Sequence, residues 1–122
     1  MTSATLRDRM SAALPDAIRS RDRTAVAALR STLAALANAE AVGVGGRDDP
    51  SATGSEHVAG AAAGVGAAEV SRRVLAEAEV VSLVRAEVEE RLESAGVYDL
   101  HGQADRAERL RAEASVISAY LD

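Results

Sequence analysis

Apolar residues recur every three or four positions through two stretches near the C-terminal end of the chain. The first series is Val81, Val84, Val88, Leu92 and Ala95, and the second is Ala104, Ala107, Leu110, Ala114, Ile117 and Leu121. This spacing places side chains on one face of an α-helix. It predicts two amphipathic helices, over about 77–95 and from about 98 or 103 to 120, closed into a hairpin by a tight turn at Gly96. The charged residues between the apolar positions, Arg91 among them, are expected to face water.

A helical hairpin with so narrow an apolar stripe cannot bury enough surface alone, so further helices must pack against it. The first third of the chain is predicted to supply them. The pattern indicates a first helix over 5–21, with Thr5 as its N-cap and Asp8 completing a capping box. Its apolar face is Leu6, Met10, Leu14, Ala17 and Ile18. Pro15 interrupts this helix, because proline removes one backbone hydrogen bond. We therefore expect a kink near 12–14 or a new first turn at Pro15.

A second helix is predicted over about 23–41, with Asp22 as its N-cap and Gly43 at its end. Its apolar stripe is Val26, Leu29, Leu33 and Leu36. The next residues differ in kind, because 43–67 hold seven glycines and one proline. They match neither a dinucleotide fingerprint nor a P-loop, so 43–74 is predicted to be a flexible Gly-rich insertion with a weak helical turn near 58–63.

The predicted fold is therefore all-α: a small bundle of two helical hairpins, with four main helices, in a single domain over 1–122. The chain has no cysteine, which excludes disulfides and thiolate chemistry. No apolar run approaches the ~18 residues of a membrane span. Nothing resembles a signal peptide, so a cytoplasmic protein without a membrane partner is expected.

Net charge is −5, which disfavours broad affinity for nucleic acid, but the charge is unevenly distributed. Residues 1–42 hold six arginines and four acidic residues, whereas 68–122 hold seven arginines and twelve acidic residues. Arg19, Arg21 and Arg23 crowd one helix end and the turn after it. They are the candidate contacts to RNA phosphates, with a solubilising cluster paired to nearby aspartates as the alternative.

The remaining charged residues are expected to have structural roles. Arg30 is predicted to form an inter-helix ion pair with Glu87 or Glu113. Glu87 and Arg91, four apart, can form a helical surface pair worth ~0.3 kcal/mol. His57 and His101 lie in separate regions and make a poor metal constellation, and the glutamates at helical spacing favour a solvated face. No catalytic, cofactor-binding or metal-binding residues are predicted.

Several segments of the chain, in this order and with this spacing, resemble the GatB/YqeY family. They are Leu6-Arg7-Asp8-Arg9-Met10, residues 18–23, Leu29-Arg30 through Leu33 to Asn38-Ala39-Glu40, residues 87–91, Ala95-Gly96, Asp99-Leu100, and Ala112-Glu113 through Ile117 to Tyr120-Leu121. The resemblance covers most of the chain outside 43–74. It implies a small cytoplasmic bacterial protein similar to the tail domain of the GatB component of the aspartyl/glutamyl-tRNA amidotransferase. In that enzyme the helical tail helps to hold the tRNA, and the chemistry is elsewhere.

The chain departs from this family pattern in four places. The family continues past the segment corresponding to Tyr120-Leu121, so a second small helical subdomain is expected to be missing. The insertion at 43–74 is longer and richer in glycine. Ala76 replaces the usual Ser or Thr cap of the third helix, and Glu89 and Glu90 replace a basic patch on it.

Two functions remain open from the sequence. The first is a non-catalytic accessory module linked to tRNA-dependent amidation, which binds tRNA or a tRNA-bearing complex. The second is a helical protein-interaction module, or a homodimer, that uses the acidic third helix and an alanine-rich seam. The resemblance also brings a family-level description as a carbon–nitrogen ligase with glutamine as amido donor. An enzyme is the third reading, because no nucleophile or ATP site is apparent.

Overall fold

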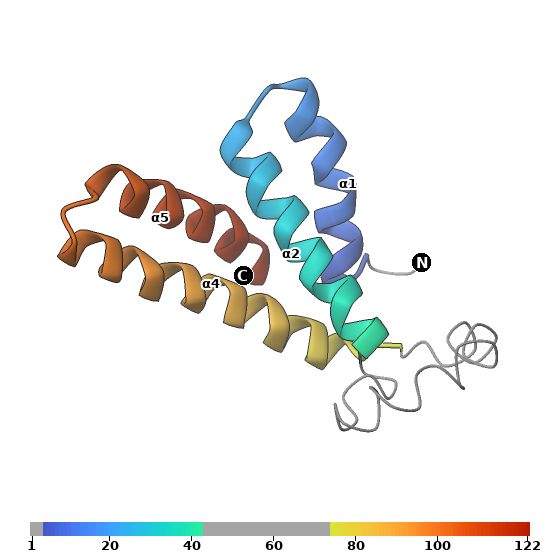
Figure 1. Cartoon of the computed structure of the whole chain (residues 1–122). Coiled ribbons are helices and arrows are strands. Elements are labelled where there is room, and N and C mark those ends of the chain that lie inside the picture. Colours follow the sequence, from blue (N-terminus) through green and yellow to red (C-terminus); the bar gives the residue numbers. More distant parts are fainter. Residues whose placement is uncertain (1–3, 43–73) are drawn as a thin grey trace, which may run out of the picture. The chain divides into compact units, whose positions relative to one another are not determined.

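The structure is a computed structural model, and it describes residues 4–42 and 74–122. Within these residues it contains four α-helices, one short 3₁₀ helix and no strand (Figure 1). The elements are α1 (Leu6–Arg19), α2 (Arg23–Val42), α4 (Glu77–Leu100), α5 (Ala104–Ser118) and the 3₁₀ helix η1 (Ala119–Leu121). The predicted all-α fold is confirmed.

Of the described residues, 4–36 and 76–122 belong to one compact unit, and 37–42 with 74–75 belong to another. The helix packing described below lies within the first unit. Several predictions for the middle of the chain concern residues 43–73, which lie outside the described residues. They are the flexible insertion over 43–74, of which only Val74 is described, its helical turn near 58–63, the helix end at Gly43, and the position of His57.

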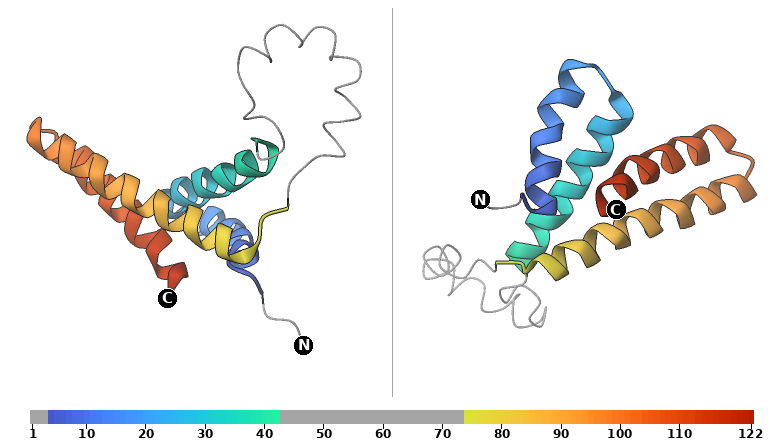
Figure 2. Two further views of the ribbon diagram at one scale, coloured as in Figure 1. Left: turned by 90° about the horizontal axis from the view of Figure 1, so that it is seen from below. Right: turned by 180° about the vertical axis from the view of Figure 1, so that it is seen from behind.

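Two helical hairpins make up the first unit. α1 and α2 run side by side and are joined by residues 20–22, and α4 and α5 run side by side and are joined by residues 101–103 (Figures 1 and 2). The backbone N–H of Leu6 donates to Glu77 Oε2 at 3.1 Å. Arg9 Nη2 donates to the carbonyl oxygen of Tyr120 at 3.0 Å. These two bonds connect α1 to the start of α4 and to η1, the 3₁₀ helix that follows α5.

The helix starts follow the capping signals in the sequence. The N–H of Asp8 donates to Thr5 Oγ1 at 3.1 Å, and the N–H of Thr5 donates to Asp8 Oδ2 at 3.3 Å. The predicted capping box is therefore confirmed. Asp22 caps α2, because its Oδ1 accepts from the N–H of Ala25 at 3.1 Å. α1 is continuous through Pro15, so the expected new first turn at that proline is wrong.

The predicted turn at Gly96 is also wrong, because α4 continues through Gly96 to Leu100. The chain reverses at Gly102, whose φ of 73° is readily adopted only by glycine. The N–H of Gln103 donates to the carbonyl of Tyr98 at 2.9 Å, and the N–H of Gly102 donates to that of Asp99 at 3.1 Å. This bonding pattern is a Schellman motif. It satisfies the last carbonyls of α4, which ends at Leu100 and not at Ala95 as the sequence suggested.

The core is built from small and medium apolar residues of all four helices. The fully or nearly buried apolar side chains are Leu6, Met10, Ala17, Ala25, Ala28, Leu29, Leu36, Val80, Val84, Val88, Ala95, Ala107, Ala114 and Ile117. On α4 the buried face agrees with the prediction at Val84, Val88 and Ala95, but Val80 and Arg91 are buried in place of Val81 and Leu92. Arg91 is buried at 9% exposure, whereas Leu92 is 48% exposed. The reason is electrostatic, because Arg91 finds carboxylate partners inside the bundle.

Candidate functional site

Arg19, Arg21 and Arg23 surround the turn between α1 and α2, and we call these three residues the basic turn. Arg19 is the last residue of α1, Arg21 lies in the turn, and Arg23 is the first residue of α2. All three are exposed. Arg19 forms an ion pair with Asp16, and both side chains are largely solvated. The three candidate residues are thus gathered at one end of the first hairpin.

Arg21 has an unusual backbone conformation, with a φ of 60°. Its N–H donates to the carbonyl of Ile18 at 3.1 Å, and the N–H of Asp22 donates to that of Ala17 at 3.0 Å. This is a second Schellman motif, with arginine where Gly102 stands in the first. A side chain with a Cβ in this left-handed region costs about 1 kcal/mol relative to glycine.

Arg23 also lies at a position where its positive charge is unfavourable, the start of α2. The amino-terminal end of a helix carries partial positive charge, so acidic residues in the first turn stabilise it and cations do not. The first turn of α2 contains no acidic residue, and it begins with Arg23. Asp22 offsets part of this cost through its bond to the N–H of Ala25. Arg19, in contrast, lies at the favourable end of α1.

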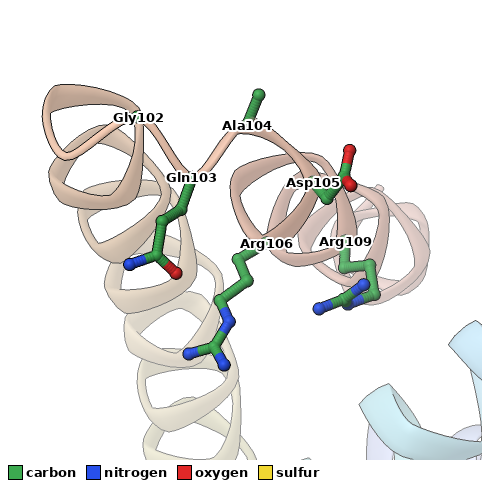
Figure 3. A pocket seen from close by; sticks show the side chains of 6 residues that line it. All are labelled: Gly102, Gln103, Ala104, Asp105, Arg106 and Arg109. Atoms are coloured by element: carbon green, nitrogen blue, oxygen red, sulfur yellow. The ribbon is translucent and has the colours of Figure 1, made fainter.

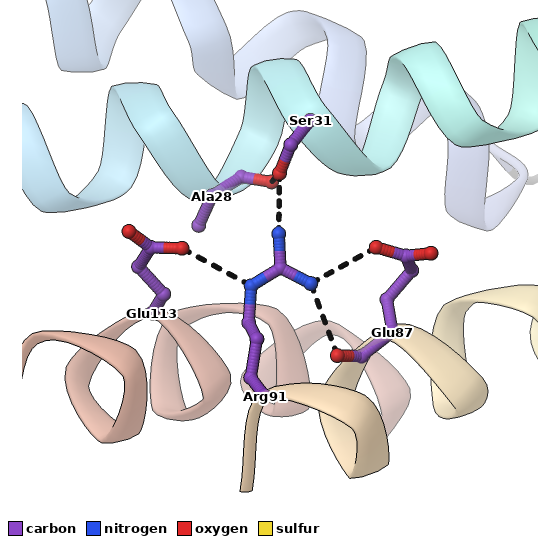
Figure 4. A network of polar contacts seen from close by, with 5 residues as sticks. All are labelled: Ala28, Ser31, Glu87, Arg91 and Glu113. Carbon is purple, nitrogen blue, oxygen red and sulfur yellow. Dashed lines mark hydrogen bonds and ion pairs between the residues drawn. The ribbon is translucent and has the colours of Figure 1, made fainter. Parts of the chain in front are cut away.

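Arg91 is the centre of a polar cluster that connects three helices (Figure 4). Its Nη1 donates to Oε1 and to the backbone carbonyl of Glu87, at 2.9 and 3.0 Å. Its Nε donates to Glu113 Oε1 on α5 at 3.1 Å, and its Nη2 donates to Ser31 Oγ on α2. The guanidinium therefore joins α4 to both α5 and α2.

This cluster corrects two expectations. Arg91 does not face water, and its pair with Glu87 is partly buried rather than a surface pair. Arg30 was predicted to pair with Glu87 or Glu113, but the structure brings both carboxylates to Arg91 instead. Arg30 is exposed on α2, and the ion pairs of both carboxylates within the described residues are made with Arg91. The signal for Arg91 was its spacing, three residues from Val88, four from Ala95 and seven from Val84, which places it on their helical face.

A second basic pair, Arg106 and Arg109, lies near the start of α5. The two side chains project to the same side of the helix and line a hollow of about 440 Å³ with residues 102–105 (Figure 3). The guanidinium of Arg106 lies 5.6 Å from the ring centre of Tyr98, a cation–π contact. Neither arginine was predicted from the sequence to be a site residue, although their spacing of three puts them on one face of the helix.

The other sequence candidates have local partners at the turn between α4 and α5. One ring nitrogen of His101, Nδ1, lies 2.9 Å from the carbonyl oxygen of Val97. Asp99 pairs with Arg111 across the hairpin, and this hydrogen bond raises the pKa of Arg111. Among the described residues, no three His, Cys, Asp or Glu side chains lie close enough together to hold a metal ion.

Thr32 is the one buried side chain in the described part of the chain whose polar atom has no hydrogen-bond partner. It lies on α2 at 0% exposure, beside Ser31 of the Arg91 cluster. An unpaired buried hydroxyl costs about 1–3 kcal/mol, so this position is a local weak point of the core.

None of the described helices is both long enough and apolar enough to cross a bilayer. Comparison of the chain with family models, curated proteins and solved structures finds no match in any of the three.

Proposed function

We propose that this chain is a non-catalytic module that binds the phosphates of folded RNA through the basic turn. The observation that carries the proposal is the left-handed backbone of Arg21. Glycine would stabilise that position, as Gly102 does in the equivalent place after α4. A residue that costs folding energy at an exposed turn indicates a role outside folding.

Arg23 supports the same proposal. An acidic residue at the first position of α2 would favour the helix, yet an arginine occupies it. Arg21 and Arg23 thus share one property. Each lowers the stability of the fold relative to another residue at its position, and each provides a guanidinium that can bind an anion. Guanidinium groups recognise phosphate through paired N–H donors, and phosphate contacts supply most of the affinity of RNA-binding surfaces.

The net charge of −5 makes this interaction local. An acidic protein has little general attraction for RNA, so binding must depend on a few well-placed cations. Arg106 and Arg109 form a further exposed pair that a bound RNA could also contact.

We further propose that the RNA is a tRNA, free or in a tRNA-bearing complex, and that the module is accessory to tRNA-dependent amidation. The support for this step is the resemblance to the GatB/YqeY family. Residues 18–23, which include the basic turn, are among the segments that resemble it. In this proposal any amide transfer is carried out by other proteins, and the chain contributes binding only.

The test is a titration of tRNA into the protein at two salt concentrations. Three phosphate contacts give a salt slope of about −2.1 to −2.7, so a fourfold rise in salt should weaken binding by about 20- to 40-fold. The double variant Arg21→Glu/Arg23→Glu is expected to lose binding. The matched control is Arg30→Glu/Arg85→Glu, which changes the net charge equally at two exposed sites outside the basic turn.

Equal losses in the two double variants would show that overall charge, and not the basic turn, governs binding. No binding of tRNA by the wild-type protein at low salt would remove the proposal.

A further inference from the structure

The solvent-facing side of the last turns of α4 carries large apolar side chains that stay about half exposed or more in the part of the chain that the structure describes. Leu92 is 48% exposed, Val97 is 52% exposed and Leu100 is 85% exposed. Leu92, Gly96 and Leu100 are four residues apart, so they form one row along the helix. We call these three residues the Leu92–Leu100 row.

Gly96 lies in the middle of this row and in the interior of α4. Glycine is the least favourable residue for a helix interior apart from proline, because it loses the most backbone freedom. Its usual justification is a neighbour that leaves no room for a Cβ atom. Here a Cβ added at Gly96 would meet no atom within 4 Å. The described chain therefore gives no internal reason for glycine at this position.

Close approach of another molecule to the backbone at Gly96 would explain why this position is a glycine. A glycine between two exposed leucines forms a notch that can receive one large apolar side chain of a helix packed across α4. A row of this kind presents the two leucines as the walls of the notch and the glycine backbone as its floor.

The charges beside the Leu92–Leu100 row indicate the charge that a partner helix would carry. Glu89, Glu90 and Glu93 are exposed, and none of them has an ion pair within the described residues. At helical spacing they lie on the same outward side of α4 as the row. An apolar row bordered by free carboxylates is complementary to an amphipathic helix that carries lysines or arginines beside its apolar stripe.

A second copy of this chain fits less well. An antiparallel dimer centred on Gly96 would place Glu93 opposite Asp99 of the copy. It would also leave Arg85 without a residue of the copy's α4 opposite it, because that helix ends at Leu100. The cation of Arg85 could then not pair with a carboxylate of the copy's α4. A parallel dimer would place each glutamate against its own counterpart. Like charges at such close range oppose association.

We propose that the outer face of α4 around the Leu92–Leu100 row is a docking site for a basic amphipathic helix of a partner protein. A large apolar side chain of that helix packs on Gly96, and its cations pair with Glu89 and Glu93. The inference does not depend on RNA binding, because it uses none of the residues of the basic turn.

The test measures binding of two synthetic peptides to the full chain by isothermal titration calorimetry. One peptide is built from leucine, lysine and alanine with the leucines at helical spacing of three and four. The other has the same composition in scrambled order. The first is expected to bind, and the scrambled peptide is expected to bind at least about tenfold more weakly because its leucines cannot face the row together.

Gly96→Leu is the decisive variant, since it fills the notch and also favours the helix, so loss of binding cannot be attributed to unfolding. It is expected to weaken binding of the patterned peptide by about tenfold or more, the loss typical of a central interface position. Ala112→Leu adds the same side chain at an exposed position of α5 and is expected to leave binding unchanged.

Three results would overturn the inference. The first is equal affinity of the wild-type protein and Gly96→Leu for the patterned peptide. The second is equal affinity of the wild-type protein for both peptides. The third is self-association of the wild-type chain, measured by sedimentation, that Gly96→Leu abolishes, because the occupant would then be a second copy.

Discussion

Replacing Arg91 by methionine should destabilise the bundle far more than a surface substitution does. Methionine keeps much of the aliphatic stem, so the change removes the guanidinium while preserving most of the packing. It leaves Glu87 and Glu113 without a cation, and it leaves Ser31 without a donor. Removing one partner of a buried ion pair costs about 3–5 kcal/mol.

The exposure of the partners sets the magnitude. The side chains of Glu87 and Glu113 are 21% and 22% exposed, so water can still reach part of each carboxylate. We therefore expect a loss near the lower limit, about 3 kcal/mol. For a domain of this size, that loss lowers Tm by about 12–24 °C. The measurement is urea and thermal denaturation followed by far-UV circular dichroism.

A compensating variant separates lost charge pairing from lost packing. Arg91→Met combined with Glu87→Gln and Glu113→Gln leaves no uncompensated carboxylate, and it should recover about 1–2 kcal/mol of the loss. If Arg91→Met alone costs less than about 0.5 kcal/mol, the value for an exposed helical pair, the cluster does not hold the helices together and the reasoning is refuted.

Two further predictions concern positions where the native residue is unfavourable. Arg21→Gly should raise the free energy of unfolding by about 0.5–1 kcal/mol, because glycine adopts the left-handed conformation without strain, and an unchanged or lower value in urea denaturation would count against that conformation. Thr32→Val should stabilise the protein by about 1 kcal/mol, because valine has a similar shape and removes the unpaired buried hydroxyl. A loss of stability in the same assay would show that the hydroxyl has a partner after all.

The helices and their starts could be predicted from the sequence because their signals are local. Thr5 and Asp8 lie three residues apart and cap α1 within a single turn. Asp22 acts on Ala25 at the same short range. Helical periodicity sustained over several turns likewise defined α4 and α5 as amphipathic elements.

The buried face of α4 could not be predicted in detail, because it depends on contacts between helices. Leu92 is more apolar than Arg91, so hydrophobic spacing alone assigns the seam to Leu92. Arg91 becomes the buried residue only because Glu113 on α5 and Ser31 on α2 accept its hydrogen bonds. Neither partner is near it in the sequence.

The end of α4 shows a similar limit. Gly96 and Gly102 are both reasonable helix ends by composition, but only Gly102 has a positive φ. The position of the turn between α1 and α2 was predicted correctly from the sequence. The strain at Arg21 was not foreseen, since arginine rarely occupies a position that favours glycine.

The central claim, that the basic turn binds RNA phosphates at a cost in stability, is tested most directly by measuring tRNA affinity of Arg21→Gly as a function of salt. This variant keeps the turn geometry and removes one cation. We predict weaker binding than wild type and a salt slope smaller by about 1, together with the higher stability described above. Unchanged affinity and slope in the more stable variant would contradict the claim, because the arginine would then have no part in binding.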